Sequence, residues 1–98
     1  MNITKNQNGN ALTVEVEGRL DTATAPELEK VLKDSLGGVT ELTLNFERLA
    51  YISSAGLRVL LSAQKQMNSQ GAMKVTNVNE LVQEVFDVTG FSDILTIE

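Results

Sequence analysis

Two adjacent serines, Ser53 and Ser54, are the residues of this chain best suited to covalent chemistry. They directly precede a segment, Leu57–Met67, in which apolar residues recur at helical spacing. A helix that begins at either serine would place a hydroxyl at its positive end, where free N–H groups and the helix dipole favour a phosphate group. A serine pair before a helix is more often a simple N-cap, so local physics alone favours that interpretation over a phosphate site.

A catalytic role for these serines has little support. The chain contains neither His nor Cys, which excludes a His-based triad, a thiolate nucleophile, a disulfide and a Cys-based metal site. Ser62-Ala63-Gln64-Lys65 matches the S-x-x-K pattern but lies in mid-helix without the companion motifs of that enzyme class. No glycine-rich phosphate loop is present. We therefore expect a protein that is not an enzyme and that holds no metal or cofactor.

A second candidate loop, Gly18–Thr24, groups small hydroxyl residues around one carboxylate, that of Asp21. Thr22 and Thr24 supply the hydroxyls. In sheets built from parallel strands and crossover helices, functional groups gather in the loops at the carboxyl ends of strands. The loop that contains Ser53 and Ser54 occupies the same kind of position, before the second helix.

The elements that position these loops follow from the apolar periodicity. Alternation predicts strands at 12–17, 41–46, 73–75 and 94–97, and Asn8-Gly9-Asn10 predicts an N-terminal hairpin. Helical spacing predicts helices from 24 to 36, from 53 or 54 to 68, and from 79 to 89. We expect Gly18 to end the first long strand, a Thr24–Glu27 capping box to start the first helix, and only a short connection to lead from residue 46 to Ser53.

This element order predicts an α/β fold with a mostly parallel sheet and an N-terminal antiparallel hairpin strand. The strands have one apolar and one polar face, whereas parallel strands covered on both faces read as nearly continuous apolar runs. We therefore expect the three helices to pack mainly on one face.

Composition and net charge limit the number of domains and the kinds of partner. The chain has 98 residues, of which 42% are hydrophobic and 21% charged, as expected for one small globular domain spanning residues 1–98. Eight basic and thirteen acidic side chains give a net charge of −5, which disfavours binding to nucleic acid or to an anionic membrane surface. The polar start and the lack of a long apolar run predict neither a signal peptide nor a membrane span, so we expect a cytoplasmic protein.

Three ordered stretches point to a family. They are Gly18-Arg19-Leu20-Asp21 with Thr24 and Pro26, Leu42–Phe46 with Tyr51–Leu57, and Val85–Phe91. Together they resemble the bacterial anti-sigma-factor antagonists, the stand-alone STAS-domain proteins of partner-switching signalling, with their G-x-L-D and D-S-[ST]-G-L loops. In this sequence Ser53 stands at the family's Asp position and Ala55 at the position of the following Ser or Thr.

The resemblance implies a phosphorylation switch. In the family, the unphosphorylated protein binds an anti-sigma factor that is also a serine kinase and so frees a sigma factor; phosphorylation of a loop serine ends the binding, and a PP2C-type phosphatase restores it. The acceptor serine falls on Ser54, with Ser53 as the alternative. We expect the partner-binding residues to be Asp21, Thr22, Thr24, Asn45, Ser53, Ser54, Ala55, Gly56, Leu57 and Arg58.

Two other functions stay open at this point. STAS domains also occur as accessory subunits of membrane transport complexes, where the serine need not be phosphorylated. A nucleotide- or small-ligand-binding domain would use the start of the second helix together with the Asp21 loop. The sequence does not identify the sigma factor or the stimulus.

Overall fold

Strands and helices alternate along the chain in the computed structural model, which describes residues 1–98. The elements are β1 (Asn2–Asn8), β2 (Ala11–Leu20), α1 (Ala25–Ser35), β3 (Glu41–Asn45), β4 (Leu49–Ile52), α2 (Ser54–Gln70), β5 (Ala72–Thr76), α3 (Glu80–Thr89) and the short 3₁₀ helix η1 (Phe91–Asp93).

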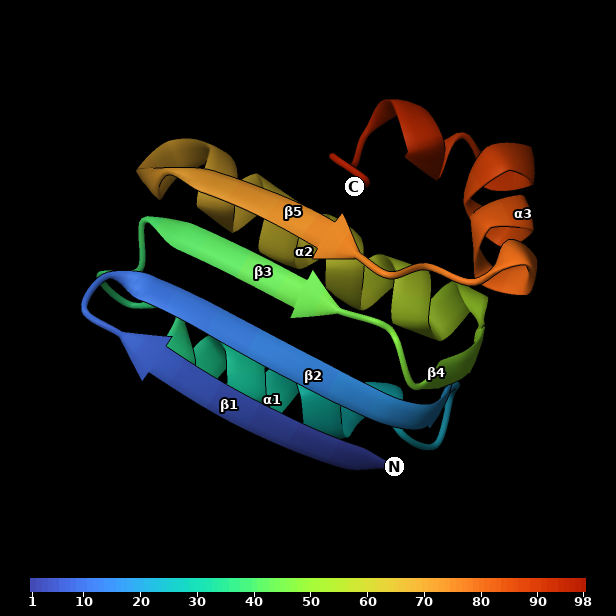
Figure 1. Cartoon of the computed structure of the whole chain (residues 1–98), viewed down its shortest axis with the longest axis horizontal. Helices are drawn as coiled ribbons and strands as arrows, with labels where there is room; N and C mark the ends of the chain where they lie inside the picture. Colours follow the sequence, from blue (N-terminus) through green and yellow to red (C-terminus); the bar gives the residue numbers. More distant parts are fainter.

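The strands form one mixed sheet in the order β1-β2-β3-β5 (Figure 1). β1 is antiparallel to β2, and the hairpin between them turns at the predicted place, with Gly9 at φ +63°. β3 is parallel to both β2 and β5, and β4 pairs in parallel with the last residues of β2. The predicted fold class is therefore confirmed: an α/β domain with a mostly parallel sheet and an N-terminal antiparallel hairpin.

The prediction that Gly18 ends the first long strand is wrong. β2 bends at Gly18 and continues to Leu20. Gly18 has φ +105°, a conformation that is costly for residues with a side chain, and the register shifts between Gly18 and Arg19. The bend lets one strand serve two partners, β3 before Gly18 and β4 after it. β4 itself was not predicted; the expected short connection contains this four-residue strand.

Helices α1 and α2 cover one face of the sheet (Figure 1), and the hydrophobic core lies between this face and the two helices. Alternate residues of β2 and β3, such as Val14 and Leu44, are fully buried in this core. Residues between them, such as Thr13 and Glu15, are on the other face and remain partly or fully exposed, as predicted. α3 packs beside β4 at the end of the molecule where the parallel strands finish.

The strand predicted at 94–97 is reduced to a single parallel bridge between Ile97 and Val75. Gly90, at φ +81°, ends α3 as predicted, but the chain then turns into η1 and buries Leu95 before it reaches the sheet edge. Only the final residues therefore align with β5, through the Val75 N–H to the Thr96 carbonyl and the Glu98 N–H to the Val75 carbonyl.

Candidate functional site

The two candidate loops lie side by side because β2 and β4 pair at their carboxyl ends. Leu20 is opposite Ile52, and the Ser53 N–H donates to the Leu20 carbonyl at 2.9 Å. One residue after each strand, the chain enters the Asp21 loop or α2. Figure 1 shows both exits at the end of the molecule where α3 also packs.

Gly56 holds the first turn of α2 against this strand pair. A Cβ atom at Gly56 would lie 2.8 Å from both Ile52 Cγ1 and Leu20 Cγ, closer than real Cβ atoms approach their neighbours. Only glycine allows so close an approach, so the start of α2 and the serines that precede Gly56 are fixed relative to the sheet.

The two serines differ in access. The Ser53 Oγ is sealed from solvent, with an accessible area below 1 Å², and has no hydrogen-bond partner. Ser53 is the N-cap residue in extended backbone conformation, whereas Ser54 is the first residue of α2 and its side chain is exposed. Only the Ser54 hydroxyl is therefore open to an incoming enzyme.

The N-terminus of α2 carries no competing negative charge. No side chain caps it, and the first turn has no acidic residue. Arg58, one turn further along, is exposed and takes part in no ion pair within 4 Å. A phosphate on Ser54 would thus meet unpaired N–H groups, the positive end of the helix dipole and a cation four residues along the helix.

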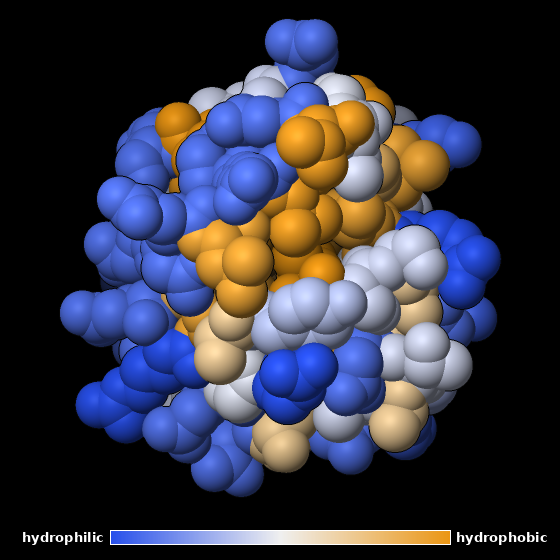
Figure 2. All heavy atoms as spheres, turned by 90° about the vertical axis from the view of Figure 1, so that its right-hand side faces the viewer, coloured by the Kyte–Doolittle hydropathy of each residue, from blue (hydrophilic) through white to orange (hydrophobic).

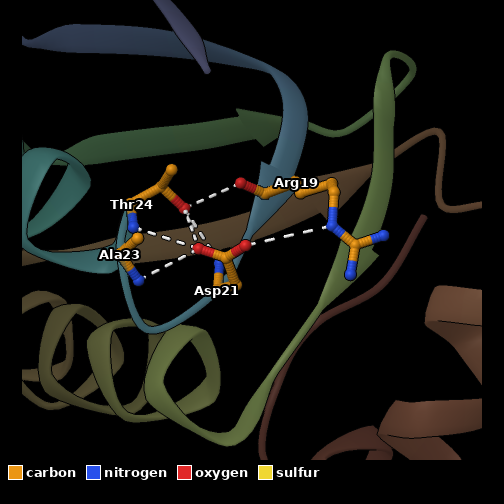
Figure 3. A network of polar contacts seen from close by, with 4 residues as sticks. All are labelled: Arg19, Asp21, Ala23 and Thr24. Carbon is orange, nitrogen blue, oxygen red and sulfur yellow. Dashed lines mark hydrogen bonds and ion pairs between the residues drawn. The ribbon is translucent and has the colours of Figure 1, made fainter.

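The Asp21 carboxylate organises the neighbouring loop (Figure 3). Its Oδ1 accepts hydrogen bonds from the N–H groups of Ala23 (3.0 Å) and Thr24 (3.1 Å), and its Oδ2 lies 3.9 Å from the Arg19 Nε. The Thr24 hydroxyl donates to the Arg19 carbonyl at 2.7 Å and accepts from the Asp21 N–H at 2.9 Å.

These contacts correct the predicted capping box. Thr24 is the N-cap of α1, but its side chain caps no N–H of the helix, because the hydroxyl is engaged with Arg19 and Asp21. The Thr24–Glu27 pair therefore starts the helix only through the backbone, by the Glu27 N–H to the Thr24 carbonyl.

The same contacts lower the pKa of the Asp21 carboxyl below its ordinary value. The backbone N–H of Thr24 has the largest effect on this pKa, because it stabilises the ionised form. Desolvation is second and opposes it, and the Thr24 side chain, the Ala23 N–H and the Arg19 charge each lower the pKa further. The loop thus keeps a fixed negative charge close to β4.

A shallow groove runs between the starts of α1 and α2. Thr22, Ala55 and Arg58 line it, together with Ala25, Pro26, Glu29 and Val59. Three of the predicted partner-binding residues therefore share one surface beside Ser54.

The other predicted residues lie differently. Gly56 and Leu57 are buried and, like most of Ala55, pack the start of α2 against the core. Asn45 lies at the end of β3 in a separate network, in which its Oδ1 accepts from the Glu47 N–H and from the Asn77 Nδ2, both at 3.0 Å. Neither of these hydrogen bonds joins Asn45 to the Ser54 or Asp21 loops.

Sequence reasoning missed one part of the site, the stacking of Arg19 on Tyr51. The Arg19 guanidinium carbon lies 4.4 Å from the centre of the Tyr51 ring, and the two residues are opposite each other in β2 and β4. The sequence does contain a signal for this contact, the Tyr51-Ile52 pair before the serines. That pair indicates the position of Tyr51 opposite Arg19 only when residues 49–52 are recognised as a strand.

Neither a metal centre nor a membrane helix is present. Nowhere do three or more carboxylate side chains gather as a metal ion would require. α2 and the other helices lack the combination of length and apolar composition that a bilayer-spanning helix needs.

A family model and a curated relative match nearly the whole chain, and solved structures share its fold. The STAS domain model matches residues 2–98. The anti-sigma-B factor antagonist of Bacillus subtilis is 31% identical, over 99% of this chain and 90% of its own length. Among solved structures, an anti-sigma factor antagonist from Mycobacterium paratuberculosis superposes with a TM-score of 0.89 at 18% identity, over 98% of this chain and 83% of that one. The Bacillus cell fate determinant SpoIIAA in its phosphorylated form superposes with a TM-score of 0.77 at 19% identity, over 99% and 91% of the two chains.

Proposed function

Because this chain belongs to the STAS domain family, we propose that it acts as an anti-sigma-factor antagonist controlled by phosphorylation of Ser54. Unphosphorylated, it binds an anti-sigma factor that is also a serine kinase, and a sigma factor is released. Once Ser54 is phosphorylated, the complex separates. In this role the protein is a substrate and binding module in the bacterial cytoplasm, not an enzyme.

One observation carries the choice of Ser54: its hydroxyl is exposed at the first residue of α2, while the Ser53 Oγ is buried. A kinase must bring the acceptor oxygen in line with a phosphoryl group, which an oxygen without accessible surface does not allow. Burial therefore favours Ser54 over Ser53, although either matched the sequence pattern.

The transfer itself needs nothing from this chain but the hydroxyl. The Ser54 Oγ attacks the γ-phosphorus of ATP held by the kinase, the bond from that phosphorus to the β–γ bridging oxygen breaks, ADP leaves, and the hydroxyl proton passes to a base of the kinase. A PP2C-type phosphatase reverses the modification: water attacks the phosphorus, the bond from phosphorus to Oγ breaks, the Oγ takes a proton to restore the hydroxyl, and inorganic phosphate leaves.

The free domain tolerates the phosphate, since the start of α2 offers N–H groups, a favourable dipole and Arg58. A partner packed over Ser54 meets about 1.5 to 2 additional negative charges within a Debye length of about 8 Å, on a chain already at −5. Desolvating that group without new cations costs a few kcal/mol, and each 1.4 kcal/mol weakens binding about tenfold. The switch therefore needs no refolding of the domain.

The test is phosphopeptide mapping after incubation with the cognate kinase and ATP. Wild type and Ser53→Ala should be labelled on Ser54, and Ser54→Ala should carry no label. Ser53→Ala is the matched control, because it removes the neighbouring hydroxyl and leaves the acceptor. Label on Ser53 in the Ser54→Ala protein, or label only outside residues 53–54, would refute the assignment.

Binding provides the second test. Ser54→Ala should bind the kinase with the affinity of the unphosphorylated wild type even in the presence of ATP. Ser54→Asp should bind at least about tenfold more weakly, with an unchanged far-UV circular dichroism spectrum. Equal affinity of the phosphorylated and unphosphorylated proteins would contradict the switch.

A further inference from the structure

Helix α3 presents an apolar stripe to solvent beside its buried face. Val82 and Phe86 point into the core and are fully buried, while Leu81, Val85 and Val88 follow one another at spacings of four and three residues along the neighbouring side. Leu81 is 50% exposed and Val88 77%. Figure 2 shows apolar atoms gathered in the upper half of this end of the molecule, where α3 lies.

The stripe is held rigidly next to the Ser54 loop. The Asn79 side chain accepts from the Val82 N–H and so caps α3, and its Nδ2 donates to the Leu49 carbonyl at 2.8 Å. Leu49 begins β4, which runs directly into Ser53 and Ser54. The Asn79 side-chain amide thus joins α3 to the strand that leads to the candidate acceptor.

The size of the domain makes the stripe and Ser54 parts of one footprint. The molecule measures 32 × 26 × 20 Å, so the end seen in Figure 2 spans only 26 × 20 Å. A standard protein–protein interface buries about 800 Å² of accessible surface on each partner, which is about 15% of the 5399 Å² that this domain exposes. α3 packs against β4, and β4 leads directly into Ser53 and Ser54. A folded partner centred on Ser54 therefore extends over α3.

The charge of α3 indicates what that partner presents. α3 carries Glu80, Glu84 and Asp87 and has no basic residue. A surface that fits this helix has an apolar centre for the stripe and basic side chains at its rim.

We propose that the Leu81–Val85–Val88 stripe is the second half of the docking surface for the protein that binds at Ser54. This inference rests on the proposed function. The stripe contributes affinity by burying apolar area whether or not Ser54 is modified, and Ser54 decides by its charge whether the complex is retained. Arg19 and Tyr51, stacked in β2 and β4 near α3, belong to residue types that often dominate interface energies.

The experiment uses the full chain and the serine kinase that phosphorylates Ser54. Leu81→Ser and Val88→Ser should each weaken binding of the unphosphorylated protein about fivefold to tenfold, and raise the KM for phosphorylation without changing kcat. Both residues are exposed, so thermal unfolding should stay close to that of the wild type. Ile94→Ser is the matched control: Ile94 is 46% exposed and lies outside α3, and this variant should bind like the wild type.

Each contrary result has a distinct meaning. If wild type is labelled and bound while the stripe variants bind equally well, the stripe proposal fails and the proposed function stands. If Ile94→Ser weakens binding as much as Leu81→Ser, the effect is not specific to α3 and the proposal also fails. A wild-type dimer that Leu81→Ser converts to a monomer in analytical ultracentrifugation would assign the stripe to a second copy of the chain. If wild type neither binds the kinase nor is labelled, both proposals fall.

Discussion

Gly56 offers a direct test of how the start of α2 is held. Substitution of Gly56 by Ala places a Cβ atom 2.8 Å from Leu20 Cγ and Ile52 Cγ1, and 3.0 Å from Leu20 Cδ2. Carbon atoms in packed interiors sit about 3.5–4.0 Å apart. The helix and the strand pair must therefore separate by several tenths of an ångström.

The expected cost follows from what surrounds the new methyl group. Leu20 and Ile52 are buried to at least 99%. Two of the three close contacts are to γ carbons, which move only when χ1 rotates, and the packed core around both side chains leaves no space for another χ1 rotamer. Overpacking of this kind costs about 1–3 kcal/mol, and the upper end applies here. The higher helix propensity of Ala offsets at most about 1 kcal/mol of this cost. The net loss is about 2 kcal/mol, a substantial fraction of the roughly 5–15 kcal/mol that stabilises a domain.

Urea unfolding followed by circular dichroism measures this loss. Gly37→Ala is the matched control, because a Cβ at Gly37 meets no atom within 4 Å and Gly37 has no positive φ; we expect its free energy of unfolding to change by less than about 1 kcal/mol. Since Ser54 lies two residues before Gly56, Gly56→Ala should also slow phosphorylation of Ser54. Equal stabilities of Gly56→Ala and Gly37→Ala would refute the close-packing argument.

Three further predictions concern single contacts. Gly71→Ala should destabilise the domain more than Gly56→Ala in the same urea assay, because its Cβ would lie 2.0 Å from the backbone oxygen of Thr40, which no rotamer change can move. Asn79→Ala should lose about 2 kcal/mol on urea unfolding, since it removes the cap of α3 and leaves the Leu49 carbonyl without its partner; a loss below about 0.5 kcal/mol would contradict this role. Asp21→Asn keeps a carbonyl oxygen for the loop N–H groups but removes the charge. Because the pKa of Asp21 is lowered by folding, the ionised carboxylate stabilises the domain above about pH 4, and this contribution is lost as the pH falls through the folded pKa. The stability difference between wild type and Asp21→Asn should therefore shrink between pH 6 and pH 3 in urea titrations, and a constant difference would exclude the charge as its cause.

The fold was predictable where local patterns agree with the tertiary environment. Asn8-Gly9-Asn10 is a hairpin turn, Asn79 caps α3, and Gly90 ends it in a left-handed conformation. Each of these features depends on a few neighbouring residues whose preferred backbone angles the whole structure also uses.

Predictions failed where a distant segment provides the partner. Gly18 reads locally as the end of a strand, but β4 supplies a second pairing partner beyond it, and so the strand continues. The Thr24 hydroxyl would cap α1 in an isolated helix; the Arg19 carbonyl and the Asp21 N–H bind it instead. Ile94 to Ile97 has the apolar pattern of a strand, yet the turn of η1 brings only its last residues to β5.

The candidate site divides in the same way. Residue types and spacing alone determined that a serine hydroxyl lies at the start of a helix, that an aspartate loop accompanies it, and that no His or Cys is available for catalysis. Which serine is accessible, how Arg19 meets Tyr51, and that α3 lies on the same end as Ser54 were decided by the pairing of β2 with β4 and by the Asn79–Leu49 bond. The physical reason is that burial and contact depend on segments far apart in the chain, whereas local backbone preferences depend on neighbours in the sequence.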